Sequence, residues 1–136
     1  MTKWGTLFAA IGGAFIGAAA TAKGLEEPLV VPSGYDVYLH EMLFENRQDH
    51  SRVARFRYVM PIIGQEGITF ENVEGDFVHL CEVQALPVLV SQDQQVGQII
   101  VSLSDRDTEF GVISSVATQF FEAFSVQDGS CIWEGF

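Results

Sequence analysis

The spacing of apolar residues changes once along this chain, and the change restricts its fold class. From Val53 to Ile63, apolar and polar side chains alternate, which is typical of a β-strand with two unlike faces. From Glu71 to Ala85, apolar residues recur every three or four positions, which indicates a helix capped by Asn72 and ended by Pro87. One helix among strands predicts a single α+β domain, an antiparallel sheet of about five strands with one helix packed on one face.

Three further segments complete the predicted sheet. Tyr35 to His40 alternates and is expected to be the first strand, followed by a loop from Glu45 to Ser51. Gln98 to Leu103 is apolar on both faces, as expected of a central strand. Gln119 to Phe136 reads as a hairpin that turns at Asp128-Gly129. We expect the helix to pack Phe77, Leu80 and Cys81 against Phe56, Ile100, Phe121 and Trp133 of the sheet.

The amino-terminal segment has the layout of a secretory signal peptide. Lys3 precedes an uncharged apolar run that closes in Ala20-Thr21-Ala22, a small-x-small motif that signal peptidase cuts. If the run stayed uncleaved it would be a membrane anchor, because about 17 residues is the lower limit for spanning. The predicted division is a signal peptide at residues 1–22, an extended lead-in at 23–34 and one domain at 35–136. Cleavage predicts a periplasmic or secreted protein that is not attached to the membrane.

Charge and composition exclude several classes of function. The 136 residues carry 18 acidic and 7 basic side chains, and 48% of them are hydrophobic. So much apolar surface argues against disorder. Removal of residues 1–22 takes away one lysine and no acid, so the net charge moves from -11 to -12. Such a charge disfavours binding to nucleic acid or to anionic lipid.

The two cysteines, Cys81 and Cys131, are predicted to form a disulfide, because an even number in a small exported domain favours pairing. The bond would tie the helix to the last strand. Closing a loop of about 50 residues should stabilise the fold by roughly 4 kcal/mol in the chain-entropy model. The alternative is a reactive thiol or metal pair using His79 and Cys81, but the chain has no Cys-x-x-Cys motif.

Candidate metal ligands are scattered. His40, His50 and His79 have no zinc-binding spacing. Asp105-x-Asp107-x-Glu109 resembles the beginning of a calcium loop, but the Gly and Glu required at its sixth and twelfth positions are absent. We therefore predict no metal site and no cofactor.

Catalytic motifs are missing as well. The serines lack a Gly-x-Ser-x-Gly elbow, and no nucleophile, base and orienting group occur together in a motif. We assign no catalytic residue. If the protein were a hydrolase or lyase, its best candidates would be Asp105, Arg106 and His79.

Two groups of residues are candidates for binding. Arg55 and Arg57 share one strand face, where they either dock an anion or acidic partner or form cross-strand ion pairs. The carboxy-terminal hairpin carries more large apolar side chains than one buried face can hold, and exposed aromatic patches mark interfaces. These side chains are Phe120, Phe121, Phe124, Ile132, Trp133 and Phe136.

Six segments between Val31 and Phe136 form a recognisable pattern: Gln98-Ile-Ile-Val-Ser-Leu-Ser-Asp-Arg, Glu109-Phe-Gly, Ala117-Thr-Gln-Phe-Phe-Glu-Ala-Phe, Asp128-Gly-Ser-Cys-Ile-Trp-Glu-Gly-Phe, His79-Leu-Cys-Glu and Ala85-Leu-Pro. Together they resemble a domain of unknown function found in small exported alphaproteobacterial proteins of the Rhodobacter and Roseobacter group. The resemblance implies no known activity. Some members are labelled acetolactate synthase, but such an enzyme needs a Gly-Asp-Gly cofactor motif, where this chain has Gln127-Asp128-Gly129.

The sequence thus favours an exported, non-enzymatic binding or accessory protein whose partner is a protein of the cell envelope. Two alternatives stay open: a periplasmic hydrolase or lyase, and a small-ligand or metal-binding protein that uses the Arg55 and Arg57 face or the carboxylates of Asp105, Asp107 and Glu109. The sequence leaves the oligomeric state open.

Overall fold

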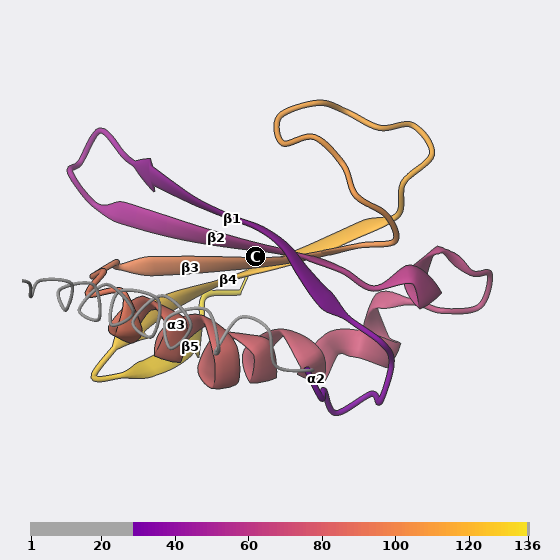
Figure 1. Cartoon of the computed structure of the whole chain (residues 1–136), viewed down its shortest axis with the longest axis horizontal. Helices are drawn as coiled ribbons and strands as arrows, with labels where there is room; N and C mark the ends of the chain where they lie inside the picture. Colours follow the sequence, from indigo (N-terminus) through magenta and orange to yellow (C-terminus); the bar gives the residue numbers. More distant parts are fainter. Residues whose placement is uncertain (1–28, 136) are drawn as a thin grey trace, which may run out of the picture.

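Residues 29–135 are described by a computed structural model of the chain, in which one sheet is covered by helices on one face (Figure 1). The sheet has five strands in the order β1-β2-β3-β4-β5. Their bounds are Tyr38–Asn46, Arg52–Val59, Gln98–Ser104, Gln119–Gln127 and Ser130–Trp133. The predicted α+β class with a single domain is confirmed. The predicted signal peptide lies outside the described residues.

Strand direction differs from the prediction at one place. β2 and β3 run parallel, whereas every other neighbouring pair is antiparallel. Parallel neighbours need a crossover connection, and the helical segment between β2 and β3 supplies it. The sheet is therefore mostly antiparallel, and β3 holds the central position predicted from its apolar faces.

The first strand is longer than predicted, since β1 begins at Tyr38 and continues to Asn46. A register shift between Leu39 and Glu41 places a bulge at His40. The bulge puts Leu39 and Met42 opposite Tyr58 and Phe56, on one face although they are three residues apart. Because of this spacing, apolar and polar residues do not alternate regularly along β1. The loop predicted from Glu45 to Ser51 therefore began too early, since the strand continues to Asn46.

The helical segment also departs from its predicted ends. It comprises α2 (Phe70–Leu80), the π-helical turn η3 (Cys81–Ala85) and α3 (Leu86–Ser91). Its cap is Thr69, whose N–H donates to Asn72 Oδ1 at 2.7 Å, so the prediction of Asn72 as the cap was wrong. Pro87 does not end the helix. In η3 the helix makes a wider turn, and the Leu86 N–H donates to the Cys81 carbonyl. A new α-helix, α3, begins after this turn. Pro87 lies in the first turn of α3, where its missing N–H is tolerated.

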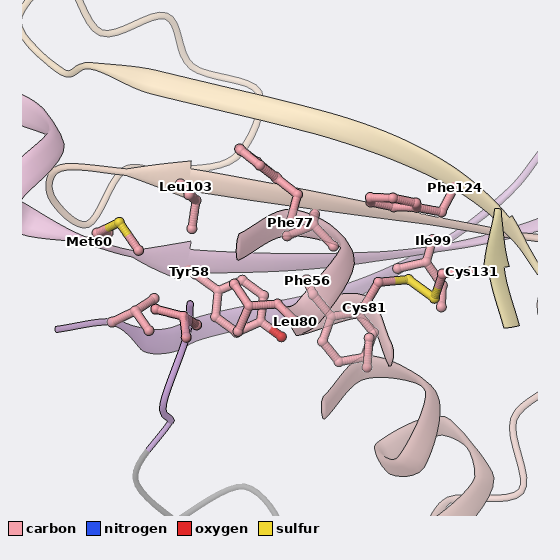
Figure 2. Packing of buried hydrophobic residues seen from close by; sticks show 14 of the residues in the cluster. Phe56, Tyr58, Met60, Phe77, Leu80, Cys81, Ile99, Leu103, Phe124 and Cys131 are labelled. Carbon is pink, nitrogen blue, oxygen red and sulfur yellow. A yellow bond between two sulfur atoms is a disulfide. The ribbon is translucent and has the colours of Figure 1, made fainter. Parts of the chain in front are cut away.

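The core lies between the helices and one face of the sheet. Figure 2 shows Phe77 and Leu80 of α2 among side chains from β2, β3 and β4. Ile100 and Phe121, predicted to meet the helix, lie on the opposite face, because Ile99 and Phe124 fill the core. A strand that is apolar on both faces carries no pattern that fixes which face turns inward.

The carboxy-terminal hairpin and its covalent link follow the prediction. Asp128 and Gly129 have φ of 51° and 76°, as a two-residue type I′ turn requires. Cys81 in η3 and Cys131 in β5 form a disulfide with their Cα atoms 6.3 Å apart (Figure 2). Among residues 29–135, no helix is long and apolar enough to cross a membrane.

The end of the predicted lead-in is packed on the domain. Val31 is a buried member of the core. The Ser33 N–H and hydroxyl both donate to the buried Asp76 carboxylate of α2, at 2.9 and 2.5 Å. These bonds fix where the chain enters the first strand.

Candidate functional site

Two hollows lie on opposite faces of the sheet. The first, here called the loop cavity, has a volume of about 180 Å³ and lies between the sheet and the segment 105–118 that joins β3 to β4. In Figure 1 this orange segment rises on the side of the sheet away from the helices. The second, here called the hairpin groove, has a volume of about 450 Å³ and lies between α2 and the β4–β5 hairpin.

The loop over the first hollow is closed at its base by Asp105. The Asp105 N–H donates to the Thr118 carbonyl, and the Thr118 N–H donates to Asp105 Oδ1, both at 3.0 Å. Hydrogen bonds from the Arg106 guanidinium, together with the bond from Thr118, hold the pKa of Asp105 below its usual value against the opposing effect of burial. Gly64 lies so close that an added Cβ would collide with the Asp105 side chain.

Arg55 and Arg57 hold the same loop down. Arg57 pairs with Glu41 of β1 and donates to the Thr108 carbonyl and hydroxyl at 3.0 and 2.9 Å, while Arg55 pairs with a second carboxylate of β1, that of Glu45. The Phe110 ring covers both guanidinium groups, whose central carbons lie 5.2 and 5.4 Å from its centroid. The geometry thus favours the ion-pair interpretation of these arginines, and an anion entering here would compete with two carboxylates.

Asp107, a second acidic residue of the loop, has partners of its own. Asp107 accepts a hydrogen bond from the Tyr38 hydroxyl at 2.8 Å, which raises the pKa of Tyr38. Asp107 also lies 3.5 Å from His40 Nδ1. Within residues 29–135, no three His, Cys, Asp or Glu side chains lie close enough to hold a metal ion.

The residues named for catalysis belong to different parts of the molecule. Asp105 and Arg106 bind each other at the base of the loop, whereas His79 belongs to α2 in the helical layer. His50 lies in the turn between β1 and β2. The structure therefore does not assemble these side chains into one site.

The hairpin residues divide between core and surface. Phe124 is 1% exposed, and Phe120 packs edge-on against Phe70 with ring centroids 5.8 Å apart. Three large apolar side chains of the described hairpin are exposed: Phe121 at 60%, Ile132 at 45% and Trp133 at 62%. Phe136 lies outside the described residues.

The hairpin groove is built from α2 on one side and from β4 and β5 on the other. Phe77 and Phe124 are buried at its base, and Val78 and Trp133 are exposed beside them. The Trp133 Nε1–H donates to the Glu122 carboxylate at 2.5 Å, which fixes the indole at the rim.

Gly75 lines the groove and was not predicted from the sequence as a site residue. A Cβ built on Gly75 would meet nothing within 4 Å, so the helix is open at this point. The available signal was an isolated glycine inside a helical pattern, which is unfavourable unless something needs the space.

Charge is unevenly distributed around the two hollows. In the described part of the chain, the helical segment 70–91 and the hairpin 119–135 contain carboxylates but no lysine or arginine. The arginines of residues 29–135 all lie between β1 and β2, on β2 or at the start of the loop: Arg47, Arg52, Arg55, Arg57 and Arg106. The hairpin groove is thus apolar, and the charged residues around it are acidic.

A comparison with protein families matches residues 11–136 to the family described as "Family of unknown function (DUF6497)". Comparisons with curated proteins and with solved structures give no match.

Proposed function

Because the chain belongs to this family of unknown function, its role has to be inferred from its own surface, and we propose that it is an exported, non-enzymatic protein that binds a partner protein in the cell envelope. The observation that carries the proposal is Trp133. Its ring is 62% exposed beside an apolar groove, although its indole N–H is held by Glu122.

A fixed, exposed indole suits a binding surface. Tryptophan offers a large contact area and is enriched among the residues that dominate binding energy. Its bond to Glu122 orders the side chain before any partner arrives, so less conformational entropy is lost on binding. The apolar residues of the groove extend this surface.

Export is supported by the cysteines and by the predicted signal peptide. The chain's only two cysteines are joined in the structure, and disulfides persist mainly in oxidising compartments. We therefore place the protein in the periplasm or outside the cell. An alphaproteobacterial origin stays a prediction, as does the rejection of the acetolactate synthase label.

The contacts of the other candidate residues favour binding over catalysis. Asp105 and Arg106 hold the base of the loop, and Arg55 and Arg57 hold its middle. These side chains have structural tasks that account for their positions. Hydrolase or lyase activity and small-ligand binding remain the competing functions.

The test is affinity capture of the tagged full chain from envelope extracts. Trp133→Ser should lose a partner that the wild type retains, because it removes the anchor from the surface of a folded domain. Ile113→Ser is the matched control, since Ile113 is 95% exposed but lies in the loop on the other face. Phe124→Asp is unsuitable because Phe124 is buried in the core.

If Trp133→Ser retains every partner and Ile113→Ser loses one, the binding surface is the loop and not the groove. A wild-type chain that captures no partner but turns over a substrate in a hydrolase screen would overturn the proposal. Circular dichroism of both variants establishes that each is folded.

A further inference from the structure

Gly75 lowers the stability of its own helix without any compensating contact in residues 29–135. A glycine inside a helix is less favourable than alanine. Close packing often explains such a glycine, but apart from its chain neighbours and the backbone of its own helix, no described atom lies within 4 Å of the missing Cβ. The glycine instead deepens the hairpin groove, which suggests that something outside the described chain enters there.

The shape of the groove fits a large apolar side chain. Its base is formed by the buried rings of Phe77 and Phe124. Val78 is 39% exposed and Trp133 is 62% exposed, so both can be covered further. The volume of the hairpin groove, about 450 Å³, exceeds that of any single side chain, so a large apolar side chain has room to enter.

The charge of the rim defines the chemistry of the occupant. Glu74 on α2 and Glu122 on β4 line the groove from its two sides. Neither forms an ion pair with another described residue, and the segments that build the groove contain no lysine or arginine. Lysine or arginine side chains on the occupant would complement these two carboxylates.

Backbone pairing along β5 is limited. The Cys131 N–H donates to Glu82 Oε2 at 3.3 Å, so this edge group already has a partner. This bond competes with an added strand at the centre of β5 and favours recognition by side chains that enter the groove.

We propose that the hairpin groove binds a basic peptide segment of the partner protein, which inserts an apolar side chain above Gly75 and places its lysines or arginines against Glu74 and Glu122. This inference rests on the proposed function and specifies its partner. A second copy of this chain is disfavoured as the occupant, because it would bring more carboxylates to an acidic surface.

The proposal can be tested with two fluorescein-labelled capped peptides that share the same phenylalanine and leucine positions. One carries arginines between these residues and the other carries glutamates. Fluorescence anisotropy with the full chain should show binding of the arginine peptide only. Equal binding of both peptides would contradict the role of the carboxylates.

Two variants examine the groove itself. Gly75→Leu fills the open space above the helix and should weaken binding of the arginine peptide at least about 10-fold, as expected for a blocked central contact. Glu122→Gln keeps an acceptor for the Trp133 indole and should weaken binding roughly 2- to 5-fold. Val90→Leu is the matched control on the same helical segment, since Val90 is 77% exposed and does not line the groove.

The outcomes separate this inference from the proposed function. If no peptide binds while Trp133→Ser still loses a captured partner, the basic peptide is the wrong occupant and the binding function stands. If Gly75→Leu binds the arginine peptide as well as the wild type does, the groove is not the site. A wild-type dimer in sedimentation that Gly75→Leu dissociates would assign the groove to a second copy and overturn the proposal.

Discussion

The loop cavity and the hairpin groove share β4 as a wall but differ in how their charged groups are satisfied. Under the loop, Arg55 and Arg57 pair with carboxylates of β1 and are covered by Phe110 of the same chain. In the groove, Glu74 and Glu122 form no ion pair with any residue from 29 to 135. Residues 29–135 supply a cover for one hollow and leave the other open.

This difference separates structural charges from charges available for binding. A charged side chain with bonds to its own chain adds little affinity for another molecule, because those bonds must first be broken. A carboxylate beside exposed apolar surface is available to an incoming cation. Arg55 and Arg57, one of the two groups of binding candidates in the sequence, are therefore the weaker candidates in the structure.

The largest effect is expected from the disulfide, whose Cys131 lines the groove. Cys131→Ser should lower the free energy of unfolding by about 4 kcal/mol, because the bond closes a loop of 50 residues. Chemical unfolding measures this change. Protease cleavage within the 105–118 loop of the native variant should stay as in the wild type, and faster cleavage there would show that the two hollows are coupled.

A smaller loss of stability is expected from a substitution under the loop. Arg57→Ala should lower the free energy of unfolding by roughly 1 to 3 kcal/mol, because it leaves Glu41 and the Thr108 carbonyl without their guanidinium partner. Limited proteolysis of the loop should accelerate while capture of the partner stays unchanged. A variant that keeps a protected loop but loses its partner would return the binding role to Arg57.

Gly75→Ala should have the opposite effect and stabilise the fold. Alanine is the better helix former and its Cβ meets no atom, so the free energy of unfolding should rise by about 0.5 to 1 kcal/mol. Denaturant titration against the wild type gives the value. A destabilised Gly75→Ala chain would mean that the glycine serves packing within the fold and that the groove needs another explanation.

The smallest effect is the pH dependence of the loop base. The bonds from Arg106 and Thr118 lower the pKa of Asp105 in the folded chain, so its contribution to stability is complete above the unfolded value and is lost as the pH falls through the folded value. Amide exchange at Thr118, corrected for the intrinsic rate, should stay protected from neutral pH down to about pH 4 and weaken below it. Asp105→Ala, which has no acceptor for the Thr118 N–H, should be unprotected throughout, and an acid-insensitive wild type would exclude this linkage.

The sequence predicted the elements whose pattern is regular. The hairpin at Asp128-Gly129, the central strand and the pairing of Cys81 with Cys131 follow from turn chemistry, apolar runs and cysteine count. The extension of β1 and the continuation of the helix past Pro87 were missed, because a bulge and a π-helical turn each break the period on which prediction relies.

The candidate site was predicted only in part. Trp133 was among the residues named for an interface, but Glu122 and Gly75 were not. Their role depends on α2 and β4 lying side by side, which is a long-range arrangement that local spacing does not report. The assignment of Phe124 to the surface group was wrong, because the face of β4 that packs on the helix could not be read from alternation alone.

The proposed binding mode requires that the groove, and not the loop, receives the partner. Hydrogen–deuterium exchange of the full chain, alone and in its captured complex, compares the two surfaces in one measurement. We expect slower exchange on binding in α2 (Phe70–Leu80) and β5 (Ser130–Trp133), with the 105–118 segment unchanged. Protection of the 105–118 segment, with α2 and β5 exchanging as in the free chain, would contradict it.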